Sequence, residues 1–358
     1  MLFAKAFGCK RFLYNVMLSD ESYHYQVMGT SLRNEVSDYK EDYPFLREVD
    51  SLVLANAKIN LSTAFQKFFD GSGNYPAFKK KSGRQSFTTN CSNKKKPNLV
   101  YDVSRQLLKL PKVEEPLKVV QHRKIKSGGL LKSATVSMET NGIYYVSLLF
   151  EYTKTEVSVV SVDTPKAIGL DMSLEHFYVD SDGNTADFPR FYRAMESRLA
   201  KEQAKLSRMV RNSHNYKKQK RRIAKLYAKI KHQRSDYLHK LSYHLVMTYD
   251  VICIESLHMK GMSKSLHLGK SVHDLGWGEF VRMLSYKSER YGKTLIMMDK
   301  FYPSSKTCGS CGYVHKDLQL SDRVFVCPKC NHLVDRDWQA ATNILSEGLR
   351  IYYNQKVV

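Results

Sequence analysis

Apolar residues change their spacing twice along the chain, and these changes divide it into three regions. Between Asp38 and Asp70 they recur every three or four residues, which predicts a small helical unit ending at the turn residues Gly71 to Asn74. From about Leu99 to Val160 the apolar runs are short and β-rich, and Asn141-Gly142 between two of them is typical of a hairpin turn. We interpret this second region as a small β-barrel.

The third region begins near Val162, where apolar strands start to alternate with long helical segments, and we place the main domain boundary there. Between Arg193 and Arg234, fifteen Lys and Arg residues stand against two acids, and Asn212 to Asn215 interrupt the apolar pattern. We predict two helices joined by a turn, each with a packed face and a cationic face. Because acids are scarce, we interpret the cationic face as one that binds along a phosphate backbone and not as an ordinary solvent-exposed face.

Charge strengthens the nucleic-acid interpretation. The 358 residues contain 57 Lys and Arg against 35 Asp and Glu, a formal charge of +22 that suits a polyanionic partner. Membrane binding is the competing explanation, but no apolar run approaches the roughly 20 residues that span a bilayer, and Met1 to Leu13 is too broken for a signal peptide. We therefore expect a cytoplasmic protein without a membrane partner and, because the remaining cysteines are scattered, without disulfides.

Four cysteines near the C-terminal end have the spacing C-x2-C-x15-C-x2-C, and they are Cys308, Cys311, Cys327 and Cys330. Two close pairs separated by such a spacer are typical of a small ribbon that binds one Zn²⁺ tetrahedrally. Four thiolates complete the coordination, so we expect a structural zinc ion and no open position for substrate.

Three acids stand on three predicted elements. Asp171 and Glu255 each end an apolar strand, and Asp337 opens a helix directly behind the cysteines. Singly, they could be a turn residue, a salt-bridged edge residue and a helix N-cap. Together, in a cationic α/β domain, they predict a site in which two Mg²⁺ or Mn²⁺ ions support phosphodiester hydrolysis.

Four segments of the C-terminal half resemble TnpB, a family of transposon-encoded nucleases related to compact type V CRISPR effectors. They are Gly169 to Asp171, Val251 to Leu257, Pro303 to Gly312 and Asp335 to Ile344. Phe7 to Asn15 and Asp236 to Ser242 also look like family patterns, although the N-terminal third matches more loosely.

The resemblance implies an α/β protein with additional β-barrel and helical parts. Its domains would be a WED start with a helical REC insertion (1–98), the WED β-barrel (99–160), a RuvC-like nuclease of RNase H fold (161–304), the zinc ribbon (305–333) and a final RuvC-like segment (334–358). Its activity would be RNA-guided, Mg²⁺-dependent cleavage of double-stranded DNA beside a target-adjacent motif, directed by a transposon-derived guide, the ωRNA. The oligomeric state stays open.

Position in the family's motifs makes Asp171, Glu255 and Asp337 the catalytic ligands, with Asp335 as the alternative to Asp337. For the flanking DNA motif we select a basic and polar cluster that could contact phosphates or base edges: Lys79, Lys80, Ser86, Phe87 and Thr88. For the nucleic-acid backbone we select six cations of the predicted helix pair: Arg208, Arg211, Lys217, Lys218, Arg221 and Arg222.

The chain departs from the family's pattern at three places. Ser173 stands where Gly is frequent, Gln339 replaces the usual Asn after the last aspartate, and Phe7 follows Met1 so closely that we expect the first WED strand to be missing. A guide-directed repressor that binds without cutting ranks lower because all three acids are present. The motif that marks single-strand transposases is not evident in this sequence, which argues against a strand-transfer transposase. A compact type V CRISPR effector would show nearly the same motifs as TnpB and stays an alternative.

Overall fold

The computed structural model describes residues 2–32, 34–92, 96–153, 163–257, 274–319 and 322–355. The chain divides into two compact units, Met1–Lys154 and Thr155–Val358. Residues 154–162, where we predicted the boundary near Val162, lie outside the described ranges. Among the described helices, none has the length and apolar character needed to cross a bilayer.

The first unit begins with helices. They are α1 (Leu2–Met28), α2 (Val36–Asp42), the short 3-10 helix η1 (Pro44–Glu48) and α3 (Ser51–Phe69). The predicted helical segment is thereby confirmed, and the Asp50 carboxylate caps α3 by accepting a hydrogen bond from the Leu52 amide. Helix α1 was not predicted from the sequence. Gly8 lies inside this helix and does not interrupt it.

Two three-stranded antiparallel sheets complete the first unit. One has the order β1-β5-β6, from β1 (Gln85–Asn90), β5 (Leu130–Met138) and β6 (Tyr144–Glu151), and the other has the order β2-β3-β4, from β2 (Val100–Asp102), β3 (Leu107–Lys109) and β4 (Leu117–Lys118). The hairpin predicted at Asn141-Gly142 joins β5 to β6, with Gly142 at φ +84°. The described strands thus form two separate hydrogen-bonded sheets, where we predicted a small β-barrel.

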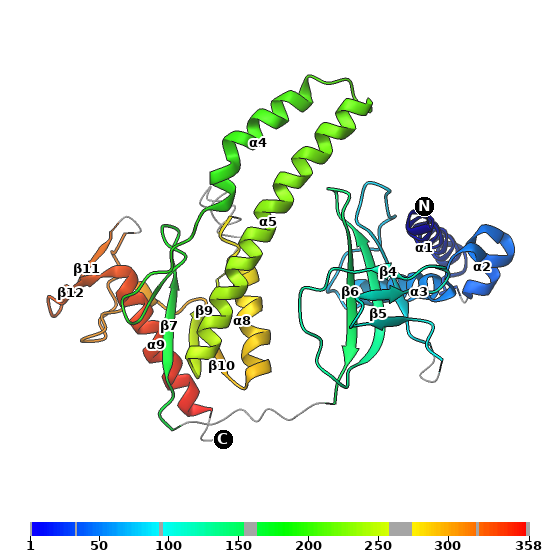
Figure 1. The fold of residues 1–358 in the computed structure, drawn as a ribbon. Helices are drawn as coiled ribbons and strands as arrows, with labels where there is room; N and C mark the ends of the chain where they lie inside the picture. Colours follow the sequence, from blue (N-terminus) through cyan, green and yellow to red (C-terminus); the bar gives the residue numbers. More distant parts are fainter. Residues whose placement is uncertain are drawn as a thin grey trace. The chain divides into compact units, whose positions relative to one another are not determined.

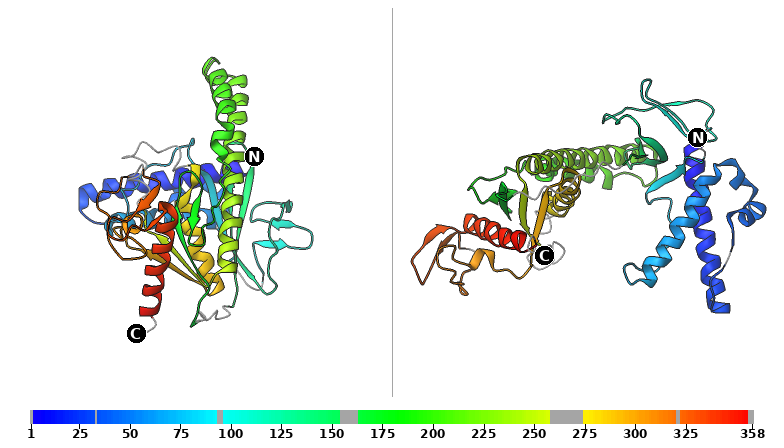
Figure 2. Two further views of the ribbon diagram at one scale, coloured as in Figure 1. Left: turned by 90° about the vertical axis from the view of Figure 1, so that its left-hand side faces the viewer. Right: turned by 90° about the horizontal axis from the view of Figure 1, so that it is seen from below.

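The second unit contains a four-stranded sheet of order β10-β9-β7-β8. Strands β7 (Ala167–Met172), β9 (Val251–Glu255) and β10 (Thr294–Met298) are parallel, and β8 (Tyr178–Asp180) runs antiparallel to β7. Strands covered on both faces read as continuous apolar runs, and β7 and β9 were recognised for that reason. Figure 2 shows α9 (Arg336–Asn354) on one side of these strands and α5 (His214–Thr248) and α8 (Trp277–Tyr291) on the other.

Alternation along the strands sorts their side chains between the two faces. Ile168, Leu170, Ile252 and Ile254 pack with α5 and α8, whereas Val251 and Cys253 pack with α9. Because successive strand residues point to opposite faces, Asp171 and Glu255 lie on the face that α9 covers.

The predicted basic helix pair is confirmed as α4 (Phe191–Ser207) and α5, which form the long antiparallel hairpin in Figure 1. Ser213 caps α5 by accepting a hydrogen bond from the Tyr216 amide. Leu199 and Ile223 are buried between the helices, whereas Val210, in the segment that joins them, is exposed.

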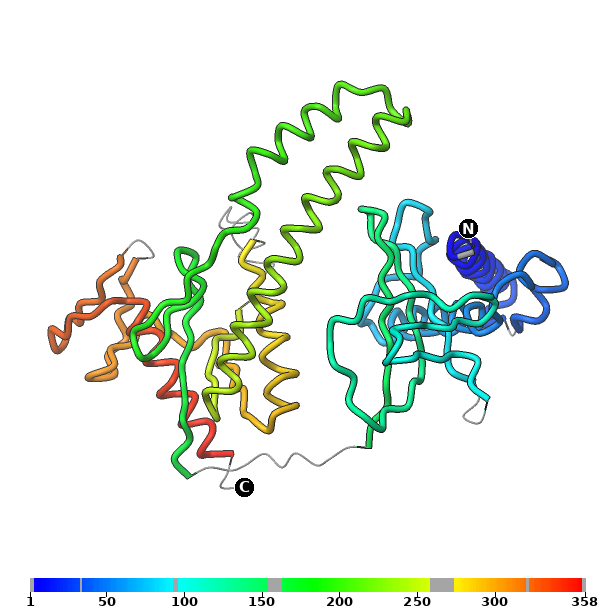
Figure 3. The backbone as a smooth tube through the Cα atoms, viewed as in Figure 1, coloured from blue at the N-terminus to red at the C-terminus, as the bar shows by residue number. Residues whose placement is uncertain are grey.

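Between β10 and α9 the chain forms a small ribbon that includes the four cysteines (Figure 3). Its elements are the 3-10 helix η2 (Ser304–Lys306) and the antiparallel strands β11 (Val324–Val326) and β12 (Leu333–Asp335). Phe325 is its buried centre, together with Cys308 and Cys327. Because α9 begins at the residue after β12, the ribbon sets the position of the first turn of α9.

Helix α9 lies unusually close to β7 and β9. A Cβ built on Gly169 would be 2.7 Å from the Leu345 backbone nitrogen, and a Cβ on Gly348 would be 2.7 Å from the Cys253 Cβ. Real Cβ atoms do not approach other atoms this closely, so both positions require glycine for the close packing of helix on sheet.

We expect Gly348→Ala to destabilise the second unit by about 1–3 kcal/mol, because a methyl group must be forced against Cys253. Gly278→Ala in α8 is the matched control, since a Cβ there meets nothing within 4 Å and alanine is favoured over glycine in helices by up to about 1 kcal/mol. Denaturant unfolding of both variants measures the difference. Equal stability of the two would contradict this account of the packing.

Candidate active site and nucleic-acid interfaces

Asp171 and Glu255 lie next to each other on adjacent parallel strands. The register pairs Gly169 with Cys253 and Leu170 with Ile254, so the next residues along the two strands are these acids. Neighbouring strands are about 4.8 Å apart, and both acids belong to the face under α9. The sheet therefore holds two half-buried carboxylates side by side.

Asp337 lies in the first turn of α9, near enough to Asp171 for their charges to interact. Asp335 immediately before the helix is its N-cap, and its Oδ1 accepts hydrogen bonds from the amides of Asp337 and Trp338 at 3.0 and 2.9 Å. The cap that we considered for Asp337 is thus made by Asp335, and the Asp337 carboxylate stays available for other partners.

Asp171 interacts electrostatically with both of the other acids. Burial, followed by the charges of Glu255 and Asp337, raises the pKa of Asp171 well above its usual range. Burial also raises the pKa of Glu255, partly offset by a hydrogen bond from the Ser304 hydroxyl. Partly buried carboxylates that repel one another are stabilised when a cation binds between them.

The oxygen atoms of the three carboxylates do not all lie within 4.8 Å of one another. In the described part of the chain, the four cysteines are the one group of potential metal ligands whose atoms all lie within 4.8 Å of one another. Asp337 instead pairs with Arg336 at 3.2 Å and with Arg323 at 3.7 Å. These arginines were missed by sequence reasoning, which looked for acids and not for the cations that compete for them.

Hydrogen bonds from α9 connect the acids to the ribbon. Buried Asn343 donates from Nδ2 to the carbonyl oxygens of Ser304 and Thr307, both at 2.7 Å, and the Ser304 hydroxyl contacts Glu255. Gln339, a departure from the family pattern, is buried and donates to the Asn343 side chain at 3.3 Å. Its amide therefore supports the ribbon and not the carboxylates.

Ser173, the other departure, is buried just beyond β7. Its hydroxyl accepts hydrogen bonds from the amides of Glu175 and His176, both at 3.3 Å. This side chain stabilises the turn that leads to β8.

The four cysteines form two facing pairs. The Sγ atoms of Cys308 and Cys330 are 3.6 Å apart, as are those of Cys311 and Cys327. A tetrahedral ion with Zn–S bonds of about 2.3 Å requires sulfur atoms roughly 3.8 Å apart. The cluster thus has the donor set and spacing of a four-thiolate zinc site.

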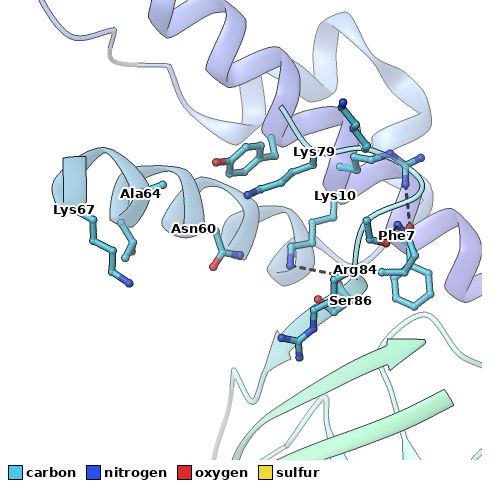
Figure 4. Close-up of a pocket in the computed structure, with 14 residues that line it drawn as sticks. Phe7, Lys10, Asn60, Ala64, Lys67, Lys79, Arg84 and Ser86 are labelled. Atoms are coloured by element: carbon cyan, nitrogen blue, oxygen red, sulfur yellow. Dashed lines mark hydrogen bonds between the residues drawn. The ribbon is translucent and has the colours of Figure 1, made fainter. Parts of the chain in front are cut away.

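A cationic pocket of about 550 Å³ lies in the first unit between α1, α3 and the segment before β1 (Figure 4). Three of the residues selected for DNA contacts line it, namely Lys79, Lys80 and Ser86. Four cations that we did not select also line it: Lys10, Arg11, Lys67 and Arg84. Lys10 and Arg11 were missed because their helix was missed.

The cations of this pocket are held close together. The Lys10 Nζ donates to the Ser86 carbonyl at 3.1 Å, and Arg11 donates to the Gln85 side chain at 3.0 Å. Burial, together with the charges of Arg84 and Lys79, lowers the pKa of Lys10. An anion in the pocket would relieve this repulsion.

Phe87 and Thr88 have structural roles in β1. Phe87 is 5% exposed, packs against Phe3 and Phe7, and belongs to the core of the first unit. Its selection as a DNA contact is corrected, because alternation along β1 turns this ring inward. Thr88 exchanges a hydrogen bond of 2.8 Å with the Thr135 hydroxyl.

The six cations selected on the helix pair are exposed: Arg208, Arg211, Lys217, Lys218, Arg221 and Arg222. Arg222 pairs with Glu202 at 3.1 Å. The outer surface of α4 and α5 is therefore predominantly cationic.

The fold and these sites define a basic protein whose α/β unit joins a cluster of strand acids to a four-cysteine ribbon. Comparison with known proteins identifies the family. Residues 150–266 match the family model described as "Probable transposase", and residues 277–344 match the model described as "Cas12f1-like, TNB domain".

Two relatives and one solved structure extend this result. A "Putative RNA-guided DNA endonuclease" of Streptomyces pristinaespiralis is 34% identical over 97% of this chain and 85% of its own length. The "Putative RNA-guided DNA endonuclease InsQ" of Escherichia coli K12 is 29% identical over 85% of this chain and 76% of its own. The fold is similar to the protein in a Cas12f1-sgRNA-target DNA complex, with a TM-score of 0.58, 14% identity and coverage of 96% of this chain and 81% of that one.

The chain belongs to the family of TnpB-like RNA-guided DNA endonucleases. The resemblance inferred from the sequence motifs is confirmed.

We expect Asp171→Asn to raise the melting temperature by a few degrees near neutral pH without divalent cations. A carboxyl whose folded pKa is raised costs no stability below its unfolded pKa of about 3.9, where both states are protonated. The cost appears as pH rises from there towards the folded pKa and persists above it. The variant's gain over wild type should therefore be absent near pH 4 and present at pH 7, as melting curves can measure. A gain that is independent of pH would contradict this assignment.

Proposed function

We propose that this protein is a Mg²⁺-dependent, RNA-guided endonuclease that hydrolyses double-stranded DNA, with Asp171, Glu255 and Asp337 as its metal ligands. The observation that carries the proposal is the placement of two half-buried acids side by side under the helix that presents the third. The names of two relatives, both RNA-guided DNA endonucleases, support an RNA guide and a DNA substrate for this protein. The sheet with its β7–β8 hairpin and helices on both faces is consistent with a RuvC-like RNase H fold.

The donor set of this site fits Mg²⁺ or Mn²⁺, because it consists of carboxylate oxygens. Two such ions, when bound, stabilise the attacking and leaving oxygens of the phosphodiester. Ser304 fixes the orientation of Glu255 through its hydroxyl. Arg336 and Arg323 pair with the Asp337 carboxylate, so these two cations would compete with a metal ion for it.

Replacing each aspartate by asparagine distinguishes the proposed role of Asp337 as a metal ligand from the role of Asp335 as a helix cap. Asp337→Asn should reduce cleavage of labelled duplex DNA by the guide-loaded protein by about 100- to 1,000-fold, the range typical for loss of one electrostatic contact to the transition state. Asp335→Asn is the matched control and should retain cleavage, because asparagine caps helices as well as aspartate does. Asp171→Asn and Glu255→Gln should behave like the Asp337 variant.

Guide-dependent DNA binding, measured by filter retention, should survive in all four variants. Persistent cutting by purified Asp171→Asn or Glu255→Gln protein would refute the assignment. Loss of cutting in Asp335→Asn with retention in Asp337→Asn would exchange the roles of the two aspartates.

We further propose that the cationic surfaces hold the nucleic acids. The pocket lined by Lys10, Lys79 and Arg84 suits DNA phosphates beside the target-adjacent motif, and the α4–α5 surface suits the guide RNA or its heteroduplex. Both depend on charge more than on base contacts, which fits a division of labour in which base pairing with the guide reads the target sequence. The first unit would supply the REC and WED functions.

We propose that Zn²⁺ occupies the four-cysteine cluster and stabilises the ribbon. The ribbon has one short pair of strands and a small buried centre, so the metal replaces the core that the segment lacks. Through Asn343 and Ser304 the ribbon also supports Glu255.

Cys308→Ser should remove the zinc, which elemental analysis of the purified protein measures as a fall from one ion per chain to near zero. Cleavage should fall with it, because the support of Glu255 is weakened. Cys91→Ser, which changes a cysteine outside the cluster, should retain both. Full zinc content in the Cys308 variant would contradict the proposal.

A further inference from the structure

Acidic side chains are concentrated in one stretch of this basic chain. Residues 17–50 contain eight Asp and Glu but three Lys and Arg, whereas the whole chain has a formal charge of +22. The stretch includes the second half of α1 and all of α2 and η1. Acids repel a phosphate backbone, so this part of the first unit is unsuited to the nucleic acids proposed above.

A second pocket of the first unit, of about 590 Å³, is partly lined by this acidic stretch and lies between α1, α3 and the segment that follows α1. Its lining differs from that of the cationic pocket, which contains six Lys and Arg and no acid. Here the charged lining residues are Glu21, Asp70 and Lys58, and Lys58 pairs with Glu35 at 2.6 Å. Most of the remaining lining is apolar or aromatic, with six rings: Tyr25, Tyr39, Phe65, Phe68, Phe69 and Tyr75.

The two pockets use different faces of α3. Ala64 and Lys67 line the cationic pocket (Figure 4), whereas Phe65 and Phe69 line the second pocket. Residues three or four apart share a helix face, so each pair marks one face. One helix therefore separates a surface that suits polyanions from a surface that is acidic and aromatic.

The aromatic rings of the second pocket are held in place and yet accessible. Tyr75 meets Phe65 and Phe68 edge to face, with ring centroids 5.7 and 5.3 Å apart. The Tyr75 hydroxyl shares a hydrogen bond of 2.7 Å with the Ser22 hydroxyl. Phe69 nevertheless keeps 70% of its surface exposed. Exposed rings in fixed positions bind apolar side chains and attract Lys or Arg to their faces.

Two acids line the pocket from different helices. The Glu21 carboxylate, on α1, accepts hydrogen bonds from the Ser31 hydroxyl at 2.6 Å and the Leu32 amide at 3.0 Å, which fix its position. Asp70 directly follows α3 and is exposed. A cationic side chain that enters the pocket is attracted by both carboxylates, whereas an anionic ligand is repelled.

We propose that this pocket binds a cationic, amphipathic segment of a partner protein, which inserts an apolar side chain among the rings and places Lys or Arg beside Glu21 and Asp70. The inference goes beyond the proposed nuclease function, because it adds a protein partner. Charge complementarity selects this occupant over an RNA, whose phosphates would face the acids. It also selects it over a second copy of this chain, whose cationic surfaces we assign to nucleic acid.

Peptide binding to the full-length, RNA-free protein tests the proposal without catalysis. The probe is a fluorescent eighteen-residue amphipathic peptide of leucine and lysine, and its charge-reversed counterpart contains leucine and glutamate. Fluorescence anisotropy should show that the lysine peptide binds although the chain as a whole is positively charged, because the local acids and rings attract it. The glutamate peptide reports binding to cationic surfaces elsewhere.

Substitutions assign the binding to the pocket. Phe69→Ser should weaken lysine-peptide binding about tenfold, as expected for loss of one aromatic anchor. Asp70→Asn should weaken it about threefold and lower its salt dependence. Neither should change the affinity for the glutamate peptide. Phe78→Ser and Asp42→Asn are the matched controls, since they change an exposed ring and an exposed acid outside the pocket lining, and they should leave lysine-peptide binding unchanged.

Melting curves should show all variants folded, and guide-dependent cleavage should persist in Phe69→Ser protein. Unchanged lysine-peptide affinity in Phe69→Ser, or an equal loss in Phe78→Ser, overturns the inference. It is also overturned if Phe69→Ser weakens binding of a labelled single-stranded RNA, or if it dissociates a dimer seen by sedimentation, because the occupant is then nucleic acid or a second copy. Peptide binding that depends on Phe69 in a protein that never cuts DNA would uphold the inference and refute the nuclease proposal.

Discussion

The second unit depends on the close approach of helix α9 to strands β7 and β9. Glycine at positions 169 and 348 lets the backbones meet where any side chain would intrude. This contact fixes the height of α9 above the sheet, so the first turn of the helix presents Asp337 towards Asp171 and Glu255. The electrostatic coupling of these carboxylates follows from that packing, as does the anchoring of Trp338 at the β8 turn.

The four-cysteine ribbon also helps to fix the position of helix α9. Strand β12 runs directly into α9, Asp335 caps the helix, and Asn343 binds the segment that begins the ribbon. The four-cysteine ribbon thus supports the position of the acid cluster. Soft sulfur ligands and hard carboxylate oxygens select different ions, so the two metal sites that we propose would not compete for one ion.

Sequence reasoning succeeded where the pattern repeats locally. The helical spacing of 38–70, the Asn141-Gly142 turn, the basic helix pair and the paired cysteines each depend on neighbouring residues, and all were identified. It missed α1, for which no helix was predicted. It also failed at Phe87, whose polar neighbours concealed an inward-facing position. The predicted barrel became two sheets because strand partners far apart in the chain are chosen by packing and not by local pattern.

By itself, the sequence determined the family, and it predicted strands β7 and β9, the α4–α5 helix pair and the paired cysteines, because each is encoded in contiguous motifs. Only the tertiary structure decided which residues surround them. Arg323, Ser304 and Lys10 approach their partners through contacts between segments that are separated in the sequence. No local pattern records such contacts, since they arise when the strands pair, the ribbon folds back and α9 closes on the sheet.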